Sequence, residues 1–217
     1  MYALPLFPLN TVLFPGMPIQ LHIFEQRYRQ MIRRCHAEAQ PFGVVLIHSG
    51  VEAYGPAAEP VRVGCTARIA HLVPLEDGRM NLTALGEERF RILKLNHDQP
   101  YLMGQVESLP LNNPSSIGLL RAARRLTPHV KEYLRLVSQL NPTEPVELDE
   151  IDFPEDPLLL THLAASLLQV PAFEKQPLLE AASAGELMAE VFRLYRRETA
   201  VLRRGEPPEE KKTAWLN

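Results

Sequence analysis

The chain has few of the features that anchor proteins in membranes or stabilise secreted ones. Only two of its 217 residues are cysteines, Cys35 and Cys65, which excludes a disulfide framework. Its longest uninterrupted apolar run is far shorter than the roughly 18 residues of a membrane helix. The opening is not typical of a signal peptide, because it has no basic segment and prolines such as Pro5 and Pro8 interrupt its apolar residues. We therefore expect a soluble, cytoplasmic protein that does not enter the membrane.

Motifs for catalysis and cofactor binding are also missing. No glycine precedes a lysine, so the phosphate-binding loop that ends in Gly-Lys-Ser/Thr is absent. The adjacent pair Cys35-His36 has no second pair near it, which argues against a zinc site and favours Cys35 as a buried residue of a helix face. A Ser-Lys dyad drawn from Ser138 and Lys175 has no support beyond the presence of both residue types. We expect no catalytic residue, no metal site and no cofactor.

The charge distribution is ordinary except in one helix. The net charge is −3, but five basic residues gather within one helical stretch: Arg121, Arg124, Arg125, Lys131 and Arg135. Such a cluster suits a phosphate backbone, but no aromatic side chains interleave with it to stack on bases. The segment 141–157, with seven acidic residues and no basic one, follows directly. A solvent-exposed helix face, partly neutralised by that segment, is the simpler interpretation, and we expect no nucleic-acid partner.

Proline is abundant instead, with 20 residues, nearly double the usual ~5%. Short strands are predicted at 3–7 and 18–23, joined by a turn at Pro15-Gly16, and their prolines favour a sheet edge or irregular pairing. Residues 24–39 carry apolar side chains at helical spacing. Further strand patterns follow at 42–49, 63–75, 79–86, 88–95 and 101–109, and Asp77-Gly78 predicts a hairpin.

From residue 117 onward the apolar spacing becomes helical. A stripe of residues at helical spacing predicts a helix through residue 140. Its members are Ile117, Leu120, Thr127, Val130, Leu134 and Val137. Asp156-Pro157 predicts a helix N-cap, Pro177 the start of a short helix, and Ser183 with Glu186 a capping box. The patterns together predict an α+β fold with a β-rich part at 1–112, a helical part at 113–204 and a polar tail at 205–217.

The order of several segments resembles a known family. These segments are LPLFPLNTVLFPGMPIQLHIFEQRYRQMI (4–32), FGVVLI, VGCTARI, DGRMNLTALGEERFRIL and KQPLLEAASAGELMAEVFRLYRRE. In this order they are similar to the Lon protease N-terminal (LON substrate-binding) domain over residues 3–204. They resemble most closely its stand-alone bacterial form, which lacks the ATPase and protease domains. The resemblance implies an N-terminal β-rich pseudo-barrel with one helix, followed by a C-terminal helical bundle.

The resemblance also implies a function. We expect a non-enzymatic module that binds polypeptides, such as unfolded or tagged proteins. The alternative is an adaptor or regulator that docks on one folded partner, such as a protease or an ATPase. Candidate peptide-contact residues are Leu13, Phe14 and Met17, because large apolar side chains at a loop tip are unusual. The competing interpretation is that these three side chains belong to the core.

Overall fold

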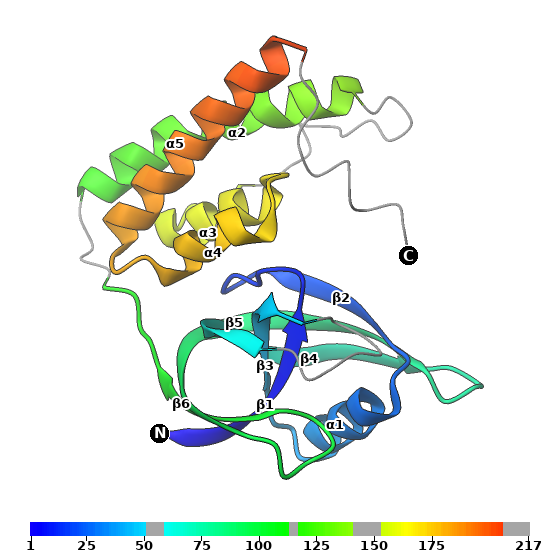
Figure 1. Cartoon of the computed structure of the whole chain (residues 1–217). Coiled ribbons are helices and arrows are strands. Elements are labelled where there is room, and N and C mark those ends of the chain that lie inside the picture. The colour runs from blue at the N-terminus through cyan, green and yellow to red at the C-terminus, as the bar shows by residue number, and fades with distance from the viewer. Residues whose placement is uncertain (51–58, 113–116, 141–152, 206–217) are drawn as a thin grey trace. The chain divides into compact units, whose positions relative to one another are not determined.

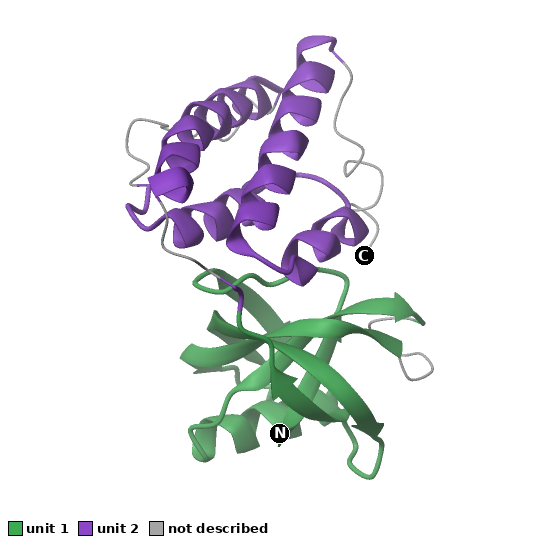
Figure 2. Ribbon diagram, turned by 90° about the vertical axis from the view of Figure 1, so that its left-hand side faces the viewer, with its two compact units in different colours: residues 1–110 green, residues 111–217 purple. Residues whose placement is uncertain are grey.

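The computed structural model describes residues 1–50, 59–112, 117–140 and 153–205. The chain forms two compact units, residues 1–110 and residues 111–217 (Figure 2). Most of the predicted acidic segment (141–152) and nearly all of the predicted tail (206–217) lie outside the described residues. None of the helices in the described ranges combines the length and the apolar character needed to cross a membrane.

Unit 1 consists of strands and one helix. Its elements are β1 (Tyr2–Leu9), β2 (Pro18–Ile23), α1 (Gln26–Ala37), β3 (Phe42–Ser49), β4 (Glu59–Pro74), β5 (Met80–Asn96) and β6 (Met103–Ser108). The strand order is β2-β5-β4-β3-β1-β6, and β5 also pairs with β6. This last pairing closes β1, β3, β4, β5 and β6 into a ring, while β2 is attached to the first part of β5 (Figure 1). The pseudo-barrel implied by the resemblance is therefore confirmed.

Strand β1 shows how the barrel accommodates its prolines. Its first half pairs with β6, where Pro5 lies opposite Met103, and its second half pairs with β3, where Pro8 lies opposite Val45. Each half thus takes a different neighbour, so a missing N–H disturbs only one ladder. For both strands the sequence predicted a sheet edge or irregular pairing. Strand β2 lies at the end of the strand order, and β1 changes its neighbour halfway along its length.

The barrel interior is filled by a compact apolar cluster. Its buried members are Leu4, Leu6, Val45, Phe90, Ile92 and Val106. Two glycines make room for the ring of Phe90, because a Cβ atom at Gly43 or Gly64 would lie 2.6 or 2.7 Å from its Cζ. Any larger residue at either glycine would force this tightly packed core apart.

Helix α1 packs with one face inward, as its spacing predicted. Tyr28, Met31, Ile32 and Cys35 are buried, and the ring centroids of Tyr28 and Phe7 are 4.2 Å apart. The two residues predicted at the ends of this face lie outside the helix. Phe24 precedes the helix and is exposed, and Ala39 follows it with a φ of 50°.

The two strands predicted at 79–86 and 88–95 are one continuous strand, β5. It begins at the predicted hairpin, where Gly78 has a φ of 81° and Leu75 N donates to Arg79 O at 2.8 Å. The register with β4 shifts between Gly86 and Arg89, where β5 has one residue more than its partner. This bulge interrupts the alternation of apolar residues, which made one strand resemble two.

Unit 2 is helical in its described part. Its helices are α2 (Ile117–Leu140), α3 (Pro157–Leu167), α4 (Ala172–Glu180) and α5 (Ala184–Arg203). Helix α2 lies along α5, and α3 contacts both (Figure 1). The rings of Tyr133 and Tyr195 meet edge to face at 5.2 Å, and the Tyr195 hydroxyl donates to Ala164 O at 2.8 Å. Two tyrosines therefore link α2, α5 and α3 at their common core.

The predicted helix caps are present, but one predicted start is wrong. The Asp156 carboxylate accepts a hydrogen bond from Leu159 N at 2.7 Å. Ser183 Oγ accepts one from Glu186 N at 3.2 Å, and the Glu186 carboxylate accepts one from Ala182 N at 2.8 Å. Pro177, however, lies inside α4, whose N-cap is Pro171. A helix of nine residues loses only one internal hydrogen bond to this proline.

Candidate functional site

The loop that the sequence offered as a contact site is buried. Leu13, Phe14 and Met17 are 4%, 0% and 6% exposed. Met17 N donates to Phe14 O at 3.1 Å, and Gly16, with a φ of 77°, occupies the position that a type II turn reserves for glycine. The exposure on which the contact hypothesis depended is absent, which agrees with the competing interpretation of core residues.

The loop is held by β5. Gly16 N donates to Gly86 O at 2.8 Å, and Gly86 N donates to Met17 O at 2.9 Å. A Cβ atom at Gly86 would lie 2.4 Å from Phe14 O, so the loop backbone approaches β5 as closely as a glycine permits. The opening stretch of the sequence is therefore part of the architecture of unit 1.

A more open surface lies between two helices of unit 2. It is a groove of about 720 Å³, which we call the α2–α5 groove. Its described lining residues are Gly118, Leu119, Arg121, Ala122 and Arg125 on α2, and Gly185, Met188, Ala189 and Phe192 on α5. Two glycines and two alanines are among them, so much of its surface is backbone and methyl groups. The hollow exists because these side chains are too small to fill it.

The larger side chains of the groove are fixed by neighbours in unit 2. The Met188 sulfur lies 3.6 Å from the Thr161 hydroxyl, which donates to Pro157 O at 2.6 Å, and Met188 is only 4% exposed. The ring of Phe192 is half-buried and stands edge to face on His129, with centroids 4.6 Å apart. These contacts preform the apolar walls of the groove.

Positive charge lines the groove on its α2 side and also lines an adjoining hollow on α5. Arg121 and Arg125 are exposed, one helical turn apart on α2, and neither has an ion-pair partner among the described residues. A shallower hollow of about 430 Å³ shares Ala189 and Phe192 with the groove and is bordered by Arg193, Arg196 and Arg197. Both sides of Phe192 are therefore lined by guanidinium groups.

Not all of these arginines are equally available. Arg193 pairs with Glu190 at 2.7 Å. Arg197 pairs with Glu174 at 2.5 Å and with Glu198 at 2.7 Å. Arg196, like Arg121 and Arg125, has no ion-pair partner in the part of the chain that the structure describes. Three guanidinium groups near the groove are therefore without a carboxylate partner among the described residues.

The sequence did not point to this groove, although it contains a relevant pattern. Gly118 and Ala122 are four residues apart on α2, and Gly185 and Ala189 have the same spacing on α5. Residues at this spacing share one helix face. The predicted stripe of α2 is confirmed at Val130, Leu134 and Val137, which are buried. It is wrong at the start of the helix, where Ile117 and Leu120 are 69% and 47% exposed. The pattern gains its meaning only once α2 and α5 are known to be neighbours.

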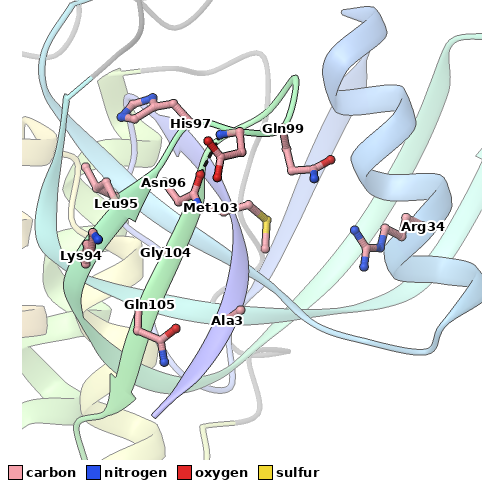
Figure 3. A pocket seen from close by; sticks show the side chains of 11 residues that line it. Ala3, Arg34, Lys94, Leu95, Asn96, His97, Gln99, Met103, Gly104 and Gln105 are labelled. Atoms are coloured by element: carbon pink, nitrogen blue, oxygen red, sulfur yellow. Dashed lines mark hydrogen bonds between the residues drawn. The ribbon is translucent and has the colours of Figure 1, made fainter.

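A second hollow, of about 730 Å³, lies in unit 1 between β1, α1, β5 and β6 (Figure 3). Seven of its eleven described lining residues are polar or charged, among them Lys94, Asn96, Gln99 and Gln105. Arg34, which lines this hollow from α1, donates hydrogen bonds to the Glu38 carboxylate at 3.1 Å and to the Tyr101 hydroxyl at 3.4 Å. Leu95 and Met103 are the largest apolar side chains there. This hollow therefore has less apolar surface to offer a ligand than the α2–α5 groove has.

The groups that could support catalysis are placed unfavourably. Burial raises the pKa of the Cys35 thiol to about 11 and that of Cys65 to about 12, so both are protonated at neutral pH. Lys175 of the hypothetical dyad donates to Ser166 O at 3.2 Å. The described ranges contain no group of three or more His, Cys, Asp or Glu residues that could hold a metal ion.

Comparison with known proteins identifies the family. The model of the ATP-dependent protease La (LON) substrate-binding domain matches residues 3–197. The chain belongs to this family. The LON domain is 29% identical over 203 residues to the Lon protease of Anaeromyxobacter dehalogenans and 30% identical over 203 residues to Lon protease 2 of Myxococcus xanthus. Each match covers 93% of this chain but 24% of the relative, so the chain spans about a quarter of the length of these curated relatives.

Solved structures share the fold. The Lon N-terminal domain protein from Xanthomonas campestris superposes with a TM-score of 0.57 at 24% identity, covering 95% of this chain and 100% of that one. The N-terminal domain of the Mycobacterium avium complex Lon protease superposes with a TM-score of 0.61 at 17% identity, covering 92% of this chain and 98% of that one. At these identities the likeness establishes the α+β fold of the LON domain.

Proposed function

We propose that this LON domain recognises apolar segments of unfolded polypeptides, and that the α2–α5 groove is the surface that binds them. The observation that carries this proposal is an open, preformed groove lined by small residues, with the half-buried ring of Phe192 at its side and Met188 buried beneath it. Its volume of about 720 Å³ lies within the range of roughly 300–1,000 Å³ that ligand sites occupy.

The energetics of such a groove suit many different clients. A floor of glycine and alanine lets the client approach the helix backbones, and each apolar side chain that leaves water contributes about 1.5–3 kcal/mol when fully buried. Apolar contact of this kind selects for hydrophobicity rather than for one sequence.

The groove also fits a function without catalysis. The family is defined as a substrate-binding domain, and the relatives named Lon protease extend over about four times the length matched here. We expect the purified chain neither to hydrolyse ATP nor to cleave casein. Activity that persists through repurification and changes with point mutations of this chain would contradict this expectation.

Docking on one folded partner is the second candidate function. It is favoured by Ile117 and Leu120, which are exposed on α2 outside the groove lining. Cross-linking in cells followed by mass spectrometry separates the two functions. A broad set of unfolded clients supports the groove, whereas one stoichiometric partner, such as a protease or an ATPase, whose cross-link is lost in Ile117→Ser, supports docking.

The decisive test fills the groove without disturbing the fold. Gly185 is exposed in α5, and a Cβ atom there would meet nothing closer than Ser183 Oγ at 4.0 Å. Gly185→Leu should therefore leave the melting temperature unchanged or raise it, because replacing a helical glycine gains about 0.5–1 kcal/mol. It should weaken binding of a labelled, uncharged apolar peptide by about 1–2 kcal/mol, since the leucine occupies the space of a client side chain.

Gly185→Ala is the matched control. It removes the same glycine but adds a single methyl group, so it should keep most of the peptide affinity. Fluorescence anisotropy gives the affinity and a thermal melt gives the stability of each variant. If Gly185→Leu binds the peptide as well as the wild type does, the groove is not the binding surface.

A further inference from the structure

Positive charge is concentrated where the groove opens. Helix α2 carries five basic side chains and one carboxylate, Glu132, although the whole chain has a net charge of −3. Glu132 is occupied by Arg135 at 3.0 Å and Arg203 at 3.2 Å, so it does not neutralise the groove. Arg121 and Arg125 line the groove itself, without a carboxylate partner among the described residues.

We propose that the α2–α5 groove prefers polypeptide segments in which acidic side chains stand next to the apolar ones. This preference rests on the polypeptide binding proposed above and adds the charge of the client. Apolar side chains of the segment contact Phe192 and Ala189, while its carboxylates pair with Arg121 and Arg125.

The chemistry of arginine supports this assignment. A guanidinium group offers a planar fork of N–H donors that a carboxylate can accept in pairs. Arg121 and Arg125 are four residues apart, so both guanidinium groups project from the same side of α2. Arg196 lies beyond Phe192 in the adjoining hollow, so a segment crossing Phe192 finds cations at both of its ends.

A nucleic acid fits this surface less well. Binding of single-stranded nucleic acid depends on aromatic side chains whose faces stack on successive bases. Phe192 is the only aromatic residue among the described lining of both hollows, and its ring already contacts His129. The combination of an apolar hollow and cations favours an amphipathic acidic polypeptide over a polyphosphate.

Two peptides of equal length test the preference. They share the same leucine, valine and phenylalanine positions, and differ only in that Asp and Glu of one are Asn and Gln in the other. We expect the acidic peptide to bind the full-length chain about five- to tenfold more tightly at low salt, which two exposed ion pairs supply. This ratio should fall toward one at about 0.3 M salt, where the screening length is well below 10 Å.

Two neighbouring arginines provide a matched pair of variants. Arg125→Gln removes a guanidinium that lines the groove, and Arg124→Gln makes the same charge change at an exposed position outside the lining. We expect Arg125→Gln to lower the acidic-to-neutral affinity ratio by about two- to fivefold and Arg124→Gln to lower it much less.

Each outcome decides between the two proposals. If both peptides bind equally and Gly185→Leu weakens both, the groove binds polypeptides and the acidic preference is refuted. If neither peptide binds, the proposed function itself fails. If Arg124→Gln acts as strongly as Arg125→Gln, or if polyglutamate or single-stranded DNA competes as well as the acidic peptide, the groove is not the source of the preference and the inference is overturned.

Discussion

Replacing Gly86 by alanine tests whether the opening stretch is architecture. The added Cβ would stand 2.4 Å from Phe14 O and 3.2 Å from both Cys65 Sγ and Leu13 Cγ. The first contact is with backbone, which cannot rotate away as a side chain can. The loop must therefore separate from β5 to accept a single methyl group.

The magnitude follows from what this separation breaks. Two backbone hydrogen bonds join the loop to Gly86, at 2.8 and 2.9 Å, and each contributes about 1 kcal/mol. Overpacking of a filled core adds about 1–3 kcal/mol. We expect Gly86→Ala to lower the free energy of unfolding by about 3–5 kcal/mol, a large part of the roughly 5–15 kcal/mol that a folded protein has.

Urea titration followed by far-UV circular dichroism measures this loss, and amide hydrogen exchange of residues 13–17 locates it. Gly185→Ala is the control, because it is the same substitution at a glycine whose Cβ would meet no close neighbour, and it should be neutral or stabilising. A loss below about 1 kcal/mol in Gly86→Ala would refute the argument. Leu13, Phe14 and Met17 would then return as candidates for peptide contact.

Two further predictions concern titratable groups. Because burial raises the pKa of Cys35 to about 11 and that of Cys65 to about 12, neither thiol should react with an aromatic disulfide reagent at pH 8 until urea unfolds the chain; rapid reaction of the native protein would contradict their burial. Hydrogen bonds from Arg135 and Arg203 lower the pKa of Glu132 to about 2, so its stabilising effect should be complete above about pH 4.5 and vanish as the pH falls through 2. Glu132→Gln should have a slightly lower urea midpoint than the wild type at pH 7 and the same midpoint near pH 2, and a difference that persists in acid would refute the role of the carboxylate.

Local interactions made much of the fold predictable. The hairpin at Asp77-Gly78 and the caps at Asp156 and Ser183 depend on residues within five positions of one another, and all three are present. The errors arose where contacts between residues far apart in the sequence determine the local structure. Pro177 falls inside α4, because packing keeps that short helix together despite the proline, and the bulge after Gly86 belongs to the pairing of β5 with β4.

The candidate site was less predictable for the same reason. Apolar residues between prolines fit either a loop tip or a core, and contact with Gly86, some seventy residues away, places Phe14 inside. The groove depends on a pair of small residues on each of two helices, and neither pair alone indicates a hollow. Sequence spacing predicts which residues share a helix face, but not which face another helix leaves uncovered.

The construction of the groove also bears on how strongly it should bind. Tyr133 and Tyr195 hold α2 and α5 together, and Thr161 and His129 fix the side chains of Met188 and Phe192. The site therefore needs little ordering when a client arrives, and the conformational entropy lost on binding is mainly that of the unfolded client. Since this loss offsets part of the apolar and ionic gain, we expect affinities that are moderate and sensitive to salt. A preformed groove of this kind favours reversible capture of many segments over tight binding of one.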